Sequence, residues 1–213
     1  MAAHPTLAVP IAGAAAGPDA WFPLVASRVV NRQRQSVLLT SATAEEAADM
    51  PLEEMLDQVG DDDAPREMFV GEVFGVSARS AWDSKLIALG RSLAAGVLSP
   101  DQATFEHEAQ FVRTLARIEA PHVRVLDVIG QDLPHRGVRR ALVQGWEISD
   151  VANAVPEYCD IAVQLVAVLE SEGLISDSAM SPVQGPQYLV SGGGPELLDR
   201  VASASEPEAI EPA

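Results

Sequence analysis

The chain has 213 residues, of which 47% are hydrophobic and 21% are charged, and its formal net charge is −17. This apolar content excludes a wholly disordered chain. The surplus of carboxylates excludes a general polyanion binder, because non-specific nucleic-acid affinity comes from cations that release phosphate counterions. A single cysteine, Cys159, excludes an intramolecular disulfide and a multi-cysteine metal site.

The negative charge is concentrated in two segments of the chain. Residues 41–75 hold eleven acidic residues and one arginine, and residues 141–213 hold twelve acidic residues and Arg200 alone. Residues 1–40 and 76–140 each carry a small positive excess. Each electrostatic expectation therefore applies to one segment at a time.

We expect residues 1–17 to form a flexible arm. The segment that begins at Leu7 and ends at Ala26 is long enough to span a membrane, but three prolines interrupt it and its Ala and Gly residues favour the bilayer only weakly. Contact with a membrane surface through this segment is the less favoured alternative. The start of the chain lacks the basic residues of a secretory signal, so the sequence predicts a cytoplasmic protein.

A helical body is predicted over residues 18–130. Its first helix begins after Asp19, a possible cap, and runs to Ala48, and a break near residues 40–43 is left open. Arg28 and Arg32 are four residues apart and share a face of this helix, where they are candidate ligands for an anion or an acidic partner. The further helices expected in the body are a short acidic one at 52–59 and others beginning near Pro65, near Ala81, at Pro100 with Ser99 as cap, and at Ala120.

Residues 131–203 show a different pattern of predicted elements. Residues 204–213 form an acidic tail that we expect to be disordered. The predicted order is a short helix, a longer helix, two short strands and a last helix, which is typical of a winged helix-turn-helix. These elements are expected at 151–155 with Ser149 and Asp150 as caps, at 157–172 with Gly173 as the stop, at 174–175, at 188–190 and at 196–202.

Three stretches resemble the Abi-alpha family of bacterial proteins, whose name links it to phage abortive infection. They are residues 85–94, the positions Phe111, Val112, Leu115, Ile118, Pro121, Val125 and Leu126, and the run Tyr188-Leu189-Val190-Ser191-Gly192. The first stretch lacks the Trp and Asn of that family's helix. The resemblance implies a helical body with a winged-helix end in a prophage or phage-defence setting, and it transfers no catalytic residue.

The basic residues lie away from the helix that would read DNA. Residues 157–172 contain no Lys or Arg, and residues 141–199 hold nine acidic residues and no basic one. A DNA-reading helix normally needs cations beside it. We therefore favour a winged-helix-like unit that is used for packing or for protein contact.

Arg136, Arg139 and Arg140 lie in the loop before this unit, together with His135. Arginine forks suit phosphate and carboxylate groups, so these residues are candidate ligands for an anion, a nucleic-acid backbone or an acidic partner. The favoured alternative is that they pair with the acidic segments of the same protein.

The sequence predicts no metal, cofactor or catalytic site. Glu119 and His122 have the spacing of a di-iron motif, but a second copy is lacking. His107 lacks the second histidine of a zinc-protease helix. Cys159 is expected to join the buried stripe of its helix and to be inert.

The preferred hypothesis is a non-enzymatic interaction or assembly module with a mainly α fold. Its acidic surfaces would meet a basic partner, or its own arginine segments in a homo-oligomer. The alternative is a DNA-binding transcriptional regulator that contacts phosphate through Arg136, Arg139 and Arg140.

Overall fold

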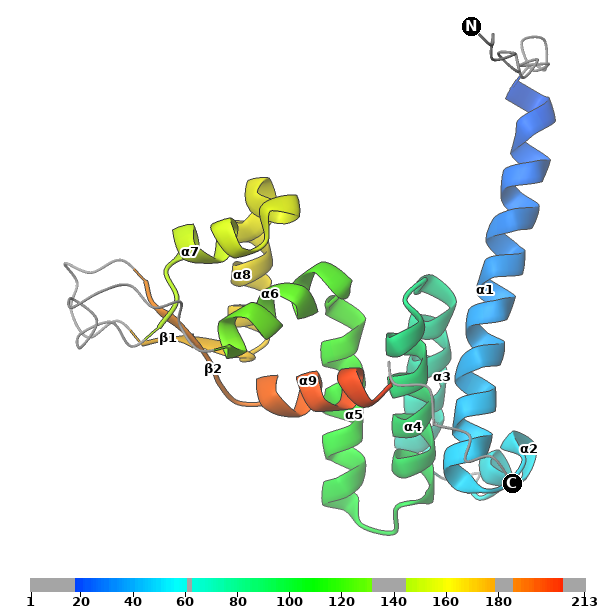
Figure 1. The fold of residues 1–213 in the computed structure, drawn as a ribbon. Coiled ribbons are helices and arrows are strands. Elements are labelled where there is room, and N and C mark those ends of the chain that lie inside the picture. The colour runs from blue at the N-terminus through cyan, green and yellow to red at the C-terminus, as the bar shows by residue number, and fades with distance from the viewer. Residues whose placement is uncertain (1–17, 61–62, 132–144, 179–185, 205–213) are drawn as a thin grey trace, which may run out of the picture.

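The computed structural model describes residues 18–60, 63–131, 145–178 and 186–204. The described chain is mainly helical with a small two-stranded antiparallel sheet, as the sequence predicts (Figure 1). Its elements are α1 (Pro18–Ala48), α2 (Leu52–Asp57), α3 (Ala64–Arg79), α4 (Asp83–Leu98), α5 (Gln102–Arg117), α6 (Ala120–Gly130), α7 (Ile148–Ala154), η2 (Pro156–Ile161), α8 (Ala162–Ser171), β1 (Ile175–Asp177), β2 (Tyr188–Val190) and α9 (Gly194–Ser203).

Helix α1 is continuous over 31 residues, so the break that was left open near residues 40–43 does not occur. The threonine hydroxyls there have acceptors that leave the backbone ladder intact. Thr43 Oγ1 donates to the carbonyl oxygen of Leu39 at 2.9 Å, and Thr40 Oγ1 lies 2.9 Å from Ser77 Oγ. The Thr43 hydroxyl thus bonds back to the carbonyl one turn before it, which a helix accommodates, and the Thr40 hydroxyl is occupied by another side chain.

Helix α4 occupies the centre of the helical body, where it packs against α1, α3, α5 and α9. Its contact with α1 is close, because a Cβ atom on Gly90 would lie 2.5 Å from the carbonyl oxygen of Thr40. Leu89 and Leu93 of the same helix belong to the main hydrophobic core, where both are fully buried. Phe69 and Phe105 close this core from α3 and α5 as an edge-to-face pair, with ring centroids 5.6 Å apart.

Two predicted helix starts are wrong. The N-cap of α5 is Asp101, not Ser99, because the Asp101 carboxylate accepts from the Thr104 amide at 3.0 Å and from the Thr104 hydroxyl at 2.8 Å. A charged acceptor with two donors is a stronger cap than a hydroxyl, and Ser99 Oγ accepts from the Asp101 amide instead. Helix α7 begins at Ile148, so Ser149 and Asp150 lie inside its first turn and do not cap it.

The single helix predicted over residues 157–172 is divided in two. The 3₁₀ helix η2 gives way to α8 at Ile161, whose φ of −120° and ψ of 6° depart from helical geometry. Gly173 ends α8 with a φ of 70°, and the Leu174 amide donates to the Leu169 carbonyl at 2.9 Å. These features confirm the predicted glycine stop as a Schellman motif.

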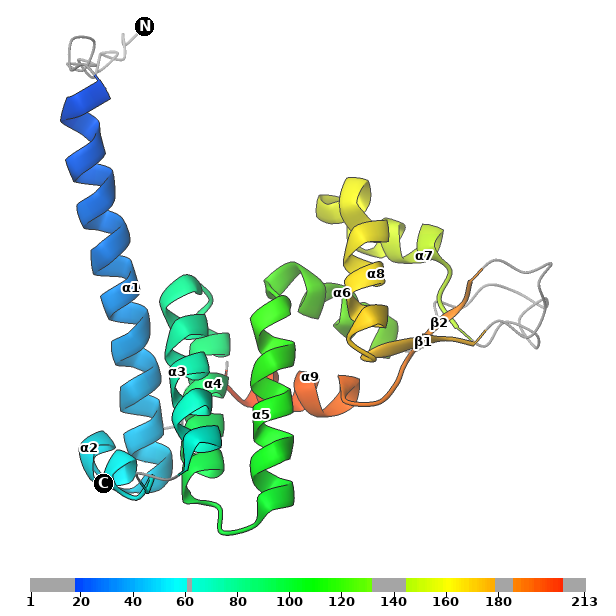
Figure 2. The same cartoon turned by 180° about the vertical axis from the view of Figure 1, so that it is seen from behind.

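The predicted hairpin is present, with Ile175 opposite Val190 in an antiparallel register. Trp146 extends it, because its amide and carbonyl both bond to the backbone of Tyr188, at 2.8 and 2.9 Å. The glycines that follow β2 allow close packing: a Cβ atom on Gly194 would lie 2.4 Å from the Leu174 carbonyl oxygen. The chain then turns into α9, which runs back to α4 and α6 (Figures 1 and 2).

Helix α6 packs against α7, α8, β2 and α9. Figure 2 shows these elements on the side of the molecule opposite α1. Of the helices in the described ranges, none combines the length and the hydrophobicity needed to cross a membrane. Residues 1–17, which hold most of the candidate membrane segment, lie outside the described part of the chain.

Candidate interaction surface

The N-terminal half of α1 leaves the rest of the molecule. In Figures 1 and 2 it extends beyond the ends of α3 and α4, and we call residues 18–31 the projecting half of α1. Every side chain described in it is exposed, including Val25 at 47%, Val29 at 50% and Val30 at 45%. Three exposed valines on one helical segment form an apolar surface, which is unusual where no partner covers it.

The face of α1 that carries Val25 and Val29 becomes polar further along the helix, where it is buried against the helical body. Ser36, Thr40 and Thr43 meet the helical body, and Ser36 Oγ donates to the Ser80 carbonyl at 2.9 Å. Val25 and Val29 lie on this face two to three turns further toward the N-terminus. The helix is therefore attached to its own body through small polar residues and presents larger apolar residues beyond it.

Of the five predicted binding arginines, the structure describes Arg28 and Arg32. Both are exposed on the side of α1 beside the exposed valines. Arg32 donates to the Ala81 carbonyl at 2.8 Å and lies 3.5 Å from the Asp83 carboxylate, an open pair that contributes little stability. Within the described ranges Arg28 forms no ion pair. Arg136, Arg139 and Arg140 lie outside the described residues.

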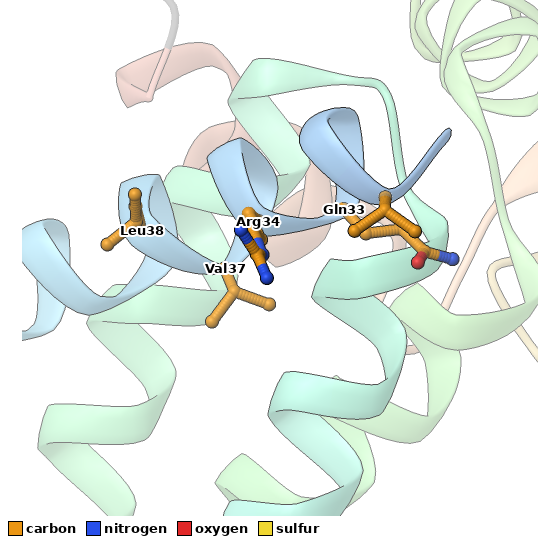
Figure 3. Close-up of a pocket in the computed structure, with 5 residues that line it drawn as sticks. Gln33, Arg34, Val37 and Leu38 are labelled. Atoms are coloured by element: carbon orange, nitrogen blue, oxygen red, sulfur yellow. The ribbon is translucent and has the colours of Figure 1, made fainter. Parts of the chain in front are cut away.

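A surface groove of about 400 Å³ runs along the outer side of α1 (Figure 3). It is lined by Val30, Gln33, Arg34, Val37 and Leu38, and we call it the α1 groove. Leu38 is 66% exposed, and Arg34 forms no ion pair with the described residues. The sequence analysis missed this site, although the spacing of Val30, Arg34 and Val37 already places them along one side of a helix.

The acidic residues gather at the opposite end of the same helix. Glu45, Glu46 and Asp49 close α1, and Glu53 and Glu54 follow in the first turn of α2. The Glu45 carboxylate accepts from the Leu52 amide at 3.0 Å, which fixes the turn between the two helices. Helix α1 is thus basic over residues 28–34, in its middle, and acidic toward its C-terminus.

Two other polar clusters hold the fold together. Lys85 is 1% exposed, and its Nζ donates to the Ile118 carbonyl and to Glu119 Oε1, both at 2.8 Å. His122 Nδ1 accepts from the Glu119 amide at 3.0 Å, and burial, aided by the charge of Lys85, lowers the pKa of its imidazole. This cluster places a cation against the carbonyl end of α5, where it is favourable.

The second cluster joins α9 to α5. The Arg200 guanidinium contacts both carboxylate oxygens of Glu108, at 2.7 and 2.8 Å, and stacks on Phe111 with its central carbon 4.4 Å from the ring centroid. Burial alone would raise the pKa of the Glu108 carboxyl. Hydrogen bonds from Arg200 and Ser92 and the charge of Arg200 outweigh burial and leave that pKa below its ordinary value.

Cys159 is exposed on η2, so its predicted place in a buried stripe is wrong. The cause is the switch from α to 3₁₀ geometry, which rotates this residue away from the side chains that α8 buries. Among the residues that the structure describes, no three His, Cys, Asp or Glu side chains gather as ligands for one metal ion.

No protein-family model, curated protein or solved structure matches this chain.

Proposed function

We propose that this protein is a non-enzymatic interaction or assembly module and that α1 is its contact element. The observation that carries the proposal is the projecting half of α1, where Val25, Val29 and Val30 are exposed beside Arg28 and no described part of the chain covers them. An isolated helical segment of this length is marginal in water without a packing partner. A helix of this kind fits recognition in which one apolar face enters a groove on another protein.

The partner surface that fits α1 is apolar with acidic residues around it. Arg28, Arg32 and Arg34 surround the apolar positions of α1. Arginines at the rim of an apolar contact steer acidic partners and disfavour basic ones. The phage-defence setting that we propose rests on the resemblance found in the sequence.

We also infer that residues 145–204 act as a winged-helix-like unit for packing or protein contact. The order of α7, η2 with α8, the hairpin of β1 and β2, and α9 supports this inference. The charge distribution supports a role other than DNA reading, because the described residues of this unit hold one basic side chain, Arg200, and it is bound to Glu108. The competing DNA-binding function depends on Arg136, Arg139 and Arg140.

Photo-cross-linking in living cells tests α1 as the contact element. A photoreactive amino acid at Val29 should give a specific protein adduct, which mass spectrometry identifies. The adduct should disappear when Arg28→Glu and Val25→Asp are introduced as well. The same probe at Val163, which is 63% exposed on α8, is the matched control. Adducts from Val163 and none from Val29 would show that another surface makes the contact.

A titration of duplex DNA into the purified chain separates the two functions. We expect no binding at ~0.1 M salt, since binding of this kind depends on cations that release counterions. Binding at low micromolar protein that weakens steeply with added salt, and that Arg136→Ala with Arg139→Ala removes, would replace our proposal with the DNA-binding one.

A further inference from the structure

We propose that the α1 groove is covered by α1 of a second copy of this chain, in an antiparallel dimer in which Arg34 of each copy meets Glu45 of the other. This inference rests on the proposed function and names the partner for one side of the same helix. It follows from the apolar residues of the groove, from the unpaired arginine among them and from the separation of charge along α1.

The first step is the exposure of the groove. Leu38, Val37 and Val30 form an apolar strip with Arg34 in its middle. Figure 3 shows Arg34, Val37 and Leu38 along α1, and the helical repeat places Leu38 on the side away from Ser36 and Thr40. Helix α1 lies at the edge of the molecule with α2 beside its C-terminal end, so a second helix can lie along it as far as α2 (Figures 1 and 2). An arginine between apolar side chains is well placed for a carboxylate from outside, since the described residues offer it none.

The second step is the position of the acid that fits this arginine. Arg34 and Glu45 are eleven residues apart, which is close to three helical turns, so the two side chains leave the same side of α1. Along the helix axis they are separated by about 16 Å. In an antiparallel pair with its two-fold axis midway between these residues, Arg34 of each copy faces Glu45 of the other. Leu38 lies next to that axis and is buried in both copies.

The third step excludes a parallel arrangement of the two α1 helices. Arg34 lies at the middle of α1, and Glu45 lies near the C-terminal end of the helix on the same side. A parallel pair would set arginine against arginine and glutamate against glutamate, which costs free energy at each contact. The antiparallel pair sets opposite charges together, and a two-fold axis makes the interface self-complementary and closed.

Sedimentation velocity of the full chain over a concentration series tests the dimer. Arg34→Glu and Glu45→Arg should each weaken dimerisation ~100-fold or more, because each turns two attractive contacts into repulsive ones. An equimolar mixture of these two variants should form a mixed dimer, since both contacts are again between opposite charges. The double variant R34E/E45R should dimerise by itself.

The controls separate a lost interface from lost folding. Arg28→Glu makes the same charge change as Arg34→Glu on another side of α1, and it should leave the dimer intact. Leu38→Glu should give monomers while keeping the Glu45 bond to the Leu52 amide. Circular dichroism should show the same helical content for all variants. Glu45→Arg also loses the bond to the Leu52 amide, so dimerisation of R34E/E45R, which lacks that bond too, is the control for its folding.

A wild-type chain that stays monomeric at ~100 micromolar would overturn the inference, as would an Arg34→Glu variant that dimerises like the wild type or a mixture that stays monomeric. None of these results affects the cross-link expected from Val29 to another protein. Failure of the dimer and failure of the proposed function are therefore distinguishable.

Discussion

Arg200 and Glu108 form a two-pronged ion pair, with N–O distances of 2.7 and 2.8 Å, that ties α9 to α5 of the helical body. The two residues are 92 positions apart in sequence. Glu108 is 3% exposed, so its charge depends on this one guanidinium for much of its stabilisation. The pair joins α9, and with it the hairpin that precedes α9, to α5.

Removal of the Glu108 charge should destabilise the fold. We expect Glu108→Gln to lower the free energy of unfolding by about 2–3 kcal/mol, because it removes the two-pronged carboxylate and leaves the part-buried Arg200 with Glu196 as its remaining ion-pair partner. Urea unfolding followed by circular dichroism measures the change. Glu106→Gln is the matched control on the exposed side of α5 and should change the value by less than about 0.5 kcal/mol. Equal effects of the two substitutions would contradict the role of the ion pair.

The Arg200–Glu108 pair makes the free energy of unfolding depend on pH. The pKa of the Glu108 carboxyl is lower in the folded chain than in the unfolded one. Its contribution is therefore complete above the unfolded pKa, about 4.3, and is lost as the pH falls through the lower folded value. Unfolding measured between about pH 3 and 6 should show a stability loss below about pH 4 that is smaller in Glu108→Gln. Identical pH profiles for the two proteins would contradict this prediction.

The stability of the fold should depend on which residue replaces the buried Lys85. Lys85→Ala removes both hydrogen bonds and leaves a cavity, and we expect a loss of about 3 kcal/mol or more. Lys85→Met keeps the volume of the stem but leaves the Ile118 carbonyl without its donor, so about 1–3 kcal/mol is expected. Chemical denaturation gives both values. A Met variant as unstable as the Ala variant would show that the ammonium matters more than the packing of the stem.

The contact between α1 and α4 depends on the absence of a side chain at Gly90. We expect Gly90→Ala to destabilise the fold by about 1–3 kcal/mol, since the new Cβ meets the backbone of α1 at Thr40. Gly75→Ala is the matched control, because nothing lies within 4 Å of its Cβ position. It should stabilise helix α3 by about 0.5–1 kcal/mol. Thermal unfolding distinguishes the opposite signs.

The sequence predicted the features that depend on neighbouring residues. The glycine stop at Gly173 and the start of α6 at Ala120 follow from local backbone preferences, and the structure contains both. The cap of α5 was misplaced by two residues, because Ser99 and Asp101 are both good caps and only the structure shows which one reaches an amide.

The features that were missed depend on residues far apart in the chain. Lys85 is a residue type that is almost always exposed, and its burial depends on the carbonyl end of α5 lying beside it. The pairing of Arg200 with Glu108 depends on α9 turning back across the molecule. The exposure of Leu38 could not be read from its apolar character, which by itself indicates burial.

The central structural claim is that the outer side of α1 pairs with α1 of a second copy, and site-specific chemical cross-linking tests this claim most directly. In a Cys159→Ser background, Leu38→Cys and Val163→Cys place single thiols on α1 and on α8, at sites 66% and 63% exposed. With a short bifunctional maleimide we predict covalent dimers from Leu38→Cys and few from Val163→Cys. Equal yields from both sites, or none from Leu38→Cys, would contradict the claim.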